Sequence, residues 1–126
     1  MAFYLEKERT TSTPYLLIDE DKGYLKLEGR SFHENITDFF RDIFDWLDVY
    51  LTTDFGAFTF DLEMDYFNSA TSKLLHNMLM KMDSFTTDEN NIIVNWITTE
   101  DNEIIIECGE DLMDEIEELT FNMVIR

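Results

Sequence analysis

Three hydroxyl side chains cluster in residues 66–73, YFNSATSK, where an alternating run gives way to helical spacing. Ser69, Thr71 and Ser72 come directly after Asn68. Capping of a helix explains one such residue well, but it explains three less well. A phosphoryl group at a helix N-terminus meets free backbone N–H groups and the positive end of the helix dipole. The cluster is therefore typical either of an ordinary helix cap or of a site of reversible phosphorylation.

The two histidines and the single cysteine form no pattern typical of catalysis or metal binding. His33 lies before the first expected helix and His76 on the polar side of the second, and neither has a Cys or another His at metal-ligand spacing. We expect both to be surface residues. Cys108 lies on an apolar stripe, and its neighbours Glu107 and Glu110 are acidic, which raises the pKa of a thiol. We expect a small core residue that reacts slowly.

A row of carboxylates is the remaining place where chemistry could occur. Asp61, Glu63 and Asp65 line one side of an expected strand, and paired carboxylates can transfer protons or hold a divalent ion. Their regular alternation is explained by a solvent-facing row. Residues 101–103 lack the Gly and the spacing of a calcium loop, and the four glycines are scattered. We therefore expect no catalytic residues, no metal and no cofactor, and hence no enzyme.

The charge balance excludes several classes of partner. The chain has 28 Asp and Glu against nine Lys and Arg, a formal net charge of −19. Such a surface repels nucleic-acid backbones and anionic membranes, so we expect neither as a partner. Three explanations of the acidity stay open: solubility, adaptation to salt, or a partner with a basic face.

Cysteine content and hydropathy bear on where the protein works. A single cysteine rules out an internal disulfide, which is typical of a reducing compartment. The first ten residues, MAFYLEKERT, lack the basic and apolar regions of a signal peptide. No apolar stretch reaches the length that spans a membrane. We expect a cytoplasmic protein.

Nine elements are expected to position the hydroxyl cluster, and a length of 126 residues fits one domain spanning residues 1–126. Apolar alternation predicts strands, and apolar residues three or four apart predict helices. The expected strands are 3–8, 15–19, 24–28, 58–65, 91–97 and 121–125, and the expected helices are 36–51, 69–83 and 103–118. This order, β-β-β-α-β-α-β-α-β, predicts an α/β fold with a single mixed sheet covered by about three helices.

Some local expectations are specific enough to test. Gly29 ends the third strand, and Asn35 caps the first helix. The stripes 36–51 and 74–82 face the sheet, so Trp46 and Leu79 are buried. Gly109 weakens the prediction of the third helix, and residues 104–106, three isoleucines, could begin it as a strand.

Short motifs along nearly the whole chain resemble the SiaC-like bacterial regulatory phosphoproteins. Each motif is weak alone, but their order and spacing together are fairly specific. They are Ser12-Thr13-Pro14, Gly29-Arg30-Ser31 with Glu34-Asn35, Tyr66-Phe67-Asn68-Ser69 with Ser72-Lys73, Val94-Asn95-Trp96 and Gly109-Glu110-Asp111.

The resemblance implies a fold, a modification and partners. Members look like anti-sigma-factor antagonists, the STAS-like fold, with the phosphosite opening a helix. A dedicated Ser/Thr kinase phosphorylates the hydroxyl residue after the Asn, and a PP2C-type phosphatase reverses this. The unmodified form binds and activates a diguanylate cyclase, which raises cyclic di-GMP and so controls biofilm formation. Carried over by position, the phosphosite is Ser69, with Thr71 and Ser72 as alternatives. The implied partner surface comprises Tyr66, Phe67, Asn68, Ser69, Ser72 and Lys73.

We therefore expect a non-catalytic phospho-switch adaptor, with rival hypotheses left open. One is an anti-sigma-antagonist-type regulator with a transcriptional output, which would differ in its partner. Another is an enzyme of unknown class, although no nucleophile–base pair supports it. A third is an acidic structural protein or nucleic-acid mimic, which would need no modified Ser69.

Overall fold

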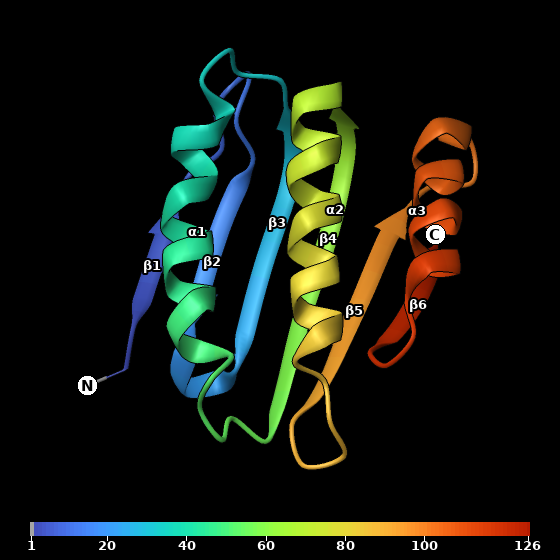
Figure 1. Ribbon diagram of the computed structural model, residues 1–126. Coiled ribbons are helices and arrows are strands. Elements are labelled where there is room, and N and C mark those ends of the chain that lie inside the picture. Colours follow the sequence, from blue (N-terminus) through green and yellow to red (C-terminus); the bar gives the residue numbers. More distant parts are fainter. Residues whose placement is uncertain (1) are drawn as a thin grey trace.

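Six strands form one mixed sheet, and three helices pack on it (Figure 1). The computed structural model describes residues 2–126. The elements are β1 (Tyr4–Lys7), β2 (Tyr15–Asp19), η1 (Glu20–Lys22), β3 (Tyr24–Ser31), α1 (Ile36–Tyr50), β4 (Ala57–Phe67), α2 (Ser69–Ser84), β5 (Asn91–Thr98), α3 (Glu103–Glu115) and β6 (Thr120–Ile125). Apart from the short 3-10 turn η1, this is the predicted order of strands and helices.

The strands follow one another across the sheet in chain order, from β1 to β6. β1, β2 and β3 pair antiparallel, whereas β3 to β6 pair parallel. A right-handed crossover always places its helix on the same side when successive strands step in one direction. Figure 1 shows α1, α2 and α3 on one face, so the other face of the sheet has no helix over it. No helix among residues 2–126 is long and apolar enough to cross a bilayer.

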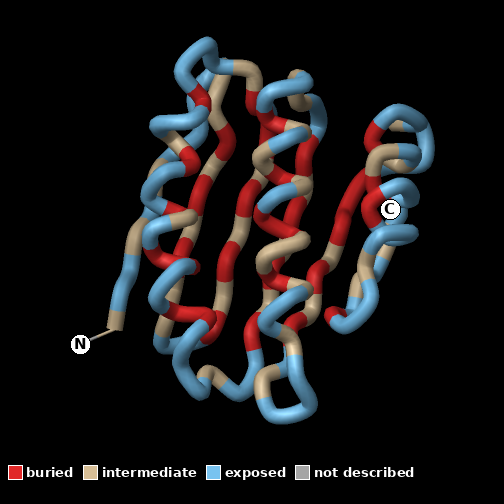
Figure 2. The backbone as a smooth tube through the Cα atoms, in the orientation of Figure 1, coloured by how far each residue is buried: buried red, intermediate tan, exposed pale blue. Residues whose placement is uncertain are grey.

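The core lies between the helices and the covered face of the sheet (Figure 2). Trp46 is 6% exposed and Leu79 is fully buried, which confirms the two predicted stripes. Phe39 and Leu74 are the exceptions and are only half-buried. The Trp46 ring stacks on Tyr50 with centroids 4.5 Å apart, and its Nε1 donates to Glu20 Oε1 at 2.8 Å. Each such large apolar side chain contributes about 1.5–3 kcal/mol on burial.

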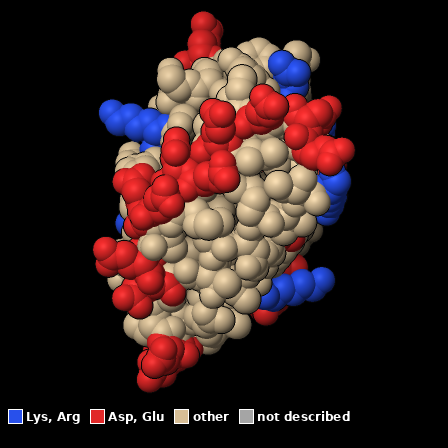
Figure 3. Space-filling model, turned by 90° about the vertical axis from the view of Figure 1, so that its right-hand side faces the viewer, with Lys and Arg blue, Asp and Glu red and all other residues tan. Residues whose placement is uncertain are grey.

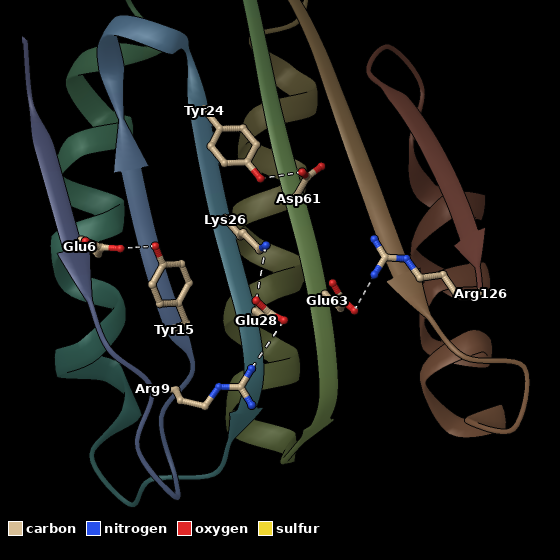
Figure 4. Close-up of polar contacts among 9 residues, drawn as sticks. All are labelled: Glu6, Arg9, Tyr15, Tyr24, Lys26, Glu28, Asp61, Glu63 and Arg126. Atoms are coloured by element: carbon tan, nitrogen blue, oxygen red, sulfur yellow. Dashed lines mark hydrogen bonds and ion pairs between the residues drawn. The ribbon is translucent and has the colours of Figure 1, made fainter.

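The open face of the sheet carries polar side chains that pair with one another (Figure 4). Tyr24 donates to Asp61 at 2.7 Å, and Arg126 donates to Glu63 at 3.2 Å. The expected carboxylate row lies here: Asp61 and Glu63 are half-buried among their partners, and Asp65 is exposed. Parallel strands are usually covered on both faces. Here mutual hydrogen bonds satisfy the polar groups of the uncovered face.

Strand β3 runs past Gly29 to Ser31, so the expectation that this glycine ends the strand is wrong. Gly29 has φ 125°, a conformation that a glycine adopts without steric penalty. The register also shifts between Gly29 and Arg30: Gly29 pairs with Met64, whereas Arg30 pairs with Tyr66. The glycine therefore accommodates a β-bulge instead of stopping the strand.

The start of α1 differs from the expected cap. Asn35 is the N-cap residue, but its side chain accepts no hydrogen bond from the backbone of the helix. Its Nδ2 donates instead to the carboxylate of Asp38 at 2.5 Å. The helix begins without side-chain capping because the amide group of Asn35 is turned toward this charged acceptor.

Helix α3 ends at Glu115, three residues before the expected end, and residues 104–106 are helical throughout. The carboxylate of Asp83, at the end of α2, accepts the backbone N–H groups of Glu117, Glu118 and Leu119. These three N–H groups would bond carbonyls in the helix if α3 continued. Hydrogen bonds to a charged acceptor are stronger than neutral ones, and they hold the segment as a loop.

Candidate functional site at the start of helix α2

A bulge at the end of β4 sets which face of the sheet each side chain before α2 points to. Because Arg30 pairs with Tyr66, Asp65 is the extra residue of the bulge. Tyr66 therefore lies on the open face, where the Arg30 guanidinium stacks over its ring at 5.4 Å. Phe67 turns to the helix side, and its ring meets Trp96 edge-on with centroids 6.1 Å apart. A bulge that redirects side chains in this way is common beside functional sites.

A buried cluster of hydrogen bonds fixes the corner between β4 and α2. Asn68 Oδ1 accepts the backbone N–H of Thr71 at 3.0 Å, and the Asn68 N–H donates to the Ser31 carbonyl at 3.1 Å. The Thr71 hydroxyl donates to that same carbonyl at 3.1 Å and lies 2.8 Å from the Ser31 hydroxyl. Thr71 and Ser31 are both fully buried. Thr71 thus works as a structural link between β3 and α2.

Ser69 is the first residue of α2 and is exposed. None of the side-chain hydrogen bonds around this corner, among the residues described, involves its hydroxyl. The first N–H groups of a helix have no partner inside the helix, and Asn68 satisfies that of Thr71 only. Ser69 therefore offers a free hydroxyl next to free backbone donors. Of the three clustered hydroxyls, Ser72 is half-buried and Thr71 is inaccessible in the folded protein.

Two hollows meet beside Ser69, and together we call them the α2–α3 groove. The first has a volume of about 360 Å³ and lies between α2 and α3. The second has a volume of about 200 Å³ and lies between the end of β4 and the start of α3. Phe67, Ser69, Ser72 and Cys108 line both. The candidate serine is thus on the rim of a groove instead of on a flat surface.

The two walls of the groove carry different charges. Lys73 and His76 stand on the α2 wall, and Asp111 and Glu115 on the α3 wall. His76 Nε2 lies 3.2 Å from Glu115 Oε2, so one polar contact bridges the two helices. Lys73 is exposed and has no carboxylate within ion-pair distance among the residues described. Lys73 therefore remains available to a group placed on Ser69, one helical turn away.

Cys108 packs against the core but is only half-buried, because it also lines the groove wall, so the expectation of a core residue is met only in part. The reason is Gly109, which seats α3 directly on the sheet: a Cβ there would come within 2.6 Å of Trp96 Nε1. Gly109 thereby takes the innermost position and turns Cys108 to the side. Burial raises the pKa of the Cys108 thiol, and the nearby carboxylates of Asp111 and Glu107 raise it further. The expected acidic neighbours were Glu107 and Glu110, so Asp111 takes the role that was expected of Glu110.

The structure brings the six expected partner-surface residues together around this corner. Phe67, Ser69, Ser72 and Lys73 line the first hollow, and Tyr66 and Asn68 line the second. His33 is exposed, and its Nδ1 accepts the N–H of Asn35 at 3.0 Å. Among residues 2–126, no group of three His, Cys, Asp or Glu is placed to hold a metal ion.

Sequence reasoning missed the α3 wall, including Ile104, which is 74% exposed and lines the second hollow. One signal was available: residues 99–125 contain no Lys or Arg, although ten Asp and Glu fall within them. Such an uninterrupted acidic run indicates a surface with a single sign of charge. It says nothing of the neighbour that this surface faces.

Comparison with known proteins gives one consistent result. A family model described as SiaC family regulatory phosphoprotein matches residues 7–126. An uncharacterized protein of Pseudomonas aeruginosa (strain UCBPP-PA14) is 24% identical over 106 residues, which cover 84% of each chain.

Two solved structures share the fold. One is SiaC of Pseudomonas aeruginosa, with a TM-score of 0.88, 21% identity, and coverage of 98% of this chain and 99% of that one. The other is a crystal structure of the diguanylate cyclase SiaD in complex with its activator SiaC, from the same organism. There the matched chain has a TM-score of 0.89 and 23% identity, with coverage of 97% of this chain and 99% of that one.

The fold and the corner define an α/β domain with an exposed serine at the first residue of a helix, on the rim of a groove. The family model spans nearly all of the chain. The protein belongs to the SiaC family of regulatory phosphoproteins. The resemblance drawn from the short motifs is thereby confirmed.

Proposed function

We propose that this protein is a non-catalytic phospho-switch adaptor of the cytoplasm, formed by a single regulatory domain over residues 1–126. Ser69 is the residue that is reversibly phosphorylated. The single observation that carries the proposal is the arrangement of the hydroxyl cluster. Thr71 is buried in a structural cluster, whereas Ser69 is exposed and unbonded at the first residue of α2.

The partners follow from the family. We infer that a dedicated Ser/Thr kinase modifies Ser69, that a PP2C-type phosphatase reverses the modification, and that the unmodified protein binds and activates a diguanylate cyclase. In this way the protein controls cyclic di-GMP and biofilm formation. The support is a solved relative of the same fold, SiaC, described as the activator of the diguanylate cyclase SiaD. The expected partner surface comprises Tyr66, Phe67, Asn68, Ser69, Ser72 and Lys73.

Phosphorylation acts locally in this scheme. A phosphate adds roughly −1.5 to −2 charges at neutral pH. The free N–H groups of the first turn of α2 and the unpaired Lys73 favour that charge. The fold is retained because Ser69 makes no buried contact that a phosphate would break. Partner binding is lost because the partner surface that contacts the small Ser69 hydroxyl has no room for a bulky phosphate dianion.

We propose a second candidate output from the expected resemblance to anti-sigma-factor antagonists, in which the phosphosite would likewise open a helix. We infer a distant relation to that STAS-like fold from the alternation of strands and helices after β2. A transcriptional regulator in place of a cyclase is the second candidate. Affinity purification from the native cell, followed by mass spectrometry of the partners, separates the two.

The test measures binding of three forms to the diguanylate cyclase recovered by that purification. Unmodified protein and Ser69→Ala should bind equally, and protein phosphorylated on Ser69 should bind at least tenfold more weakly, a loss of about 1.4 kcal/mol or more by calorimetry. Ser72→Ala is the matched control and should still be switched by the kinase. Equal binding of the phosphorylated and unmodified forms would leave Ser69 as a helix cap only.

A further inference from the structure

The α2–α3 groove has two ends of different chemistry. The end beside Ser69 is mainly apolar, with Phe67, Ile104 and Cys108 lining the smaller hollow. The far end lies between His76 on α2 and the carboxylates Asp111 and Glu115 on α3. Ile104 is 74% exposed, so the apolar end of the groove presents an aliphatic side chain that a docked segment can contact.

Helix α3 is charged in a way that its own stability does not explain. Cations stabilise the last turn of a helix and carboxylates destabilise it, by about 0.3–1 kcal/mol each. The last turn of α3 has no basic residue but contains Asp114 and Glu115, with Glu117 and Glu118 directly after it. Figure 3, which faces the side of α3 and β6, shows acidic side chains gathered in a band beside uncharged surface.

We infer that the α2–α3 groove receives a basic segment of a partner protein, which inserts one large apolar side chain at the Ser69 end and places its cations against Asp111 and Glu115. This inference rests on the proposed function and adds to it the α3 wall and the chemistry of the occupant. Charge complementarity selects the occupant, because an acidic or neutral segment would gain nothing from this wall. A cation of the segment displaces His76 from Glu115.

The two ends explain how a negative phosphate can weaken the binding of a basic segment. Ser69 and His76 are seven residues apart on one helix, which is roughly 10 Å at about 1.5 Å per residue. That distance equals the Debye length at roughly 0.1 M salt, so a phosphate attracts the distant cations only weakly. At its own end the phosphate takes the place of the apolar side chain. Burying a dianion against an apolar group is strongly unfavourable.

The test selects ligands without assuming any natural partner. A phage-displayed library of random peptides is panned on the unmodified, full-length protein. Selected peptides should be rich in Lys and Arg around one large apolar residue, and their affinity should fall as salt increases. Enrichment of acidic or uncharged peptides would overturn the inference, as would peptides that bind independently of the groove.

Matched variants locate the binding. D111N/E115Q should weaken the selected peptides at least tenfold. The control D88N/E89Q removes the same charge from two exposed residues of the α2–β5 loop and should change affinity less than twofold. Ile104→Ser should also weaken binding, whereas Val49→Ser, which alters a residue 68% exposed on α1, should not. Equal losses with D111N/E115Q and D88N/E89Q would mean attraction by net charge alone, and the groove proposal would fail.

The outcome is separable from that of the proposed function. Phosphorylation of Ser69 should abolish binding of the groove-dependent peptides while leaving circular dichroism unchanged. If the peptides behave as expected but no diguanylate cyclase is recovered, the cyclase partnership fails and the groove stands. If the cyclase binds and is switched, yet D111N/E115Q and Ile104→Ser bind it as the wild type does, the groove inference fails and the switch stands.

Discussion

At the scale of single residues, the hydroxyl cluster separates into one structural and one accessible member. Thr71 bonds the Ser31 carbonyl and lies 2.8 Å from the Ser31 hydroxyl, in a fully buried position. Ser69, two residues earlier, is exposed. Identical chemistry therefore has different consequences, because a helix turns successive residues by about 100° and only some of them face the sheet.

Replacing Thr71 with Val should test this division. The change keeps the shape of the side chain but leaves the buried Ser31 hydroxyl without its partner, while the Ser31 carbonyl keeps only the N–H of Asn68. Such unsatisfied groups cost about 1–3 kcal/mol in the free energy of unfolding, measured by urea denaturation. Ser72→Ala, at a half-buried position, should cost less than about 0.5 kcal/mol. Kinase treatment followed by mass spectrometry should still find the phosphate on Ser69 in Thr71→Val; its loss from the folded variant would make Thr71 the acceptor.

At the scale of elements, the position of α3 depends on contacts at both of its ends. Gly109 lets the helix approach Trp96, whose Nε1 donates to the Ile105 carbonyl at 3.0 Å. Asp83 then holds the loop that follows, through the backbone N–H groups of residues 117–119. Together these contacts set how far α3 stands from α2, and thus the width of the groove between them.

The Asp83 anchor makes a prediction about pH. Burial acts to raise the pKa of this carboxyl, but the hydrogen bonds from Leu119, Glu118 and Glu117 outweigh it and leave the pKa below its ordinary value of 3.8. A lowered pKa in the folded state stabilises the protein above the pKa of the unfolded chain, about 3.9, and the contribution is lost as the pH falls through the folded value. Asp83→Asn should therefore lower the free energy of unfolding by about 1–3 kcal/mol at neutral pH.

The difference between wild type and Asp83→Asn should begin to shrink as the pH falls below about 4, where the unfolded chain takes up a proton, and should vanish once the pH lies below the lowered pKa of folded Asp83. Urea denaturation at a series of pH values measures it. Asp88→Asn is the control, since Asp88 is exposed and makes no such bonds. A difference that stays constant with pH would mean that the carboxylate charge at Asp83 does not contribute.

At the scale of the whole molecule, the net charge of −19 acts against the compact state. The ion pairs among residues 2–126 are largely exposed, for example Lys7 with Asp42, and exposed pairs contribute only about 0–1 kcal/mol. Self-repulsion therefore dominates the response to salt.

The urea concentration at the midpoint of unfolding should rise as sodium chloride is increased from roughly 0.01 M to 1 M. Over that range the Debye length falls from about 30 to about 3 Å, which screens the repulsion. The same salt should weaken partner binding if the acidic wall contributes to it. D111N/E115Q, with two fewer negative charges, should gain less stability from salt than the wild type. A midpoint that falls with salt would show that ion pairs outweigh the repulsion.

Much of the fold could be predicted from the sequence because it depends on local periodicity. The alternation of Phe58 to Met64 and the helical spacing from Ile36 onward each arise within one element. The order of nine elements then leaves few topologies, since parallel crossovers are right-handed. The ends of helices were predicted less accurately. Helix α3 stops at Glu115 because Asp83, 34 residues or more away along the chain, accepts hydrogen bonds from the backbone of the loop that follows.

By itself the sequence determined the class of fold, the acidic character, the family and the serine-rich corner, because these depend on residue type and near-neighbour order. Only the tertiary structure decided which hydroxyl is free, since Thr71 is buried against Ser31 from another strand. It also decided that Gly29 lies opposite a bulge at Asp65, that Gly109 turns Cys108 into the groove, and that α3 forms its second wall. Each of these depends on an approach between segments distant in the chain, which no local pattern encodes.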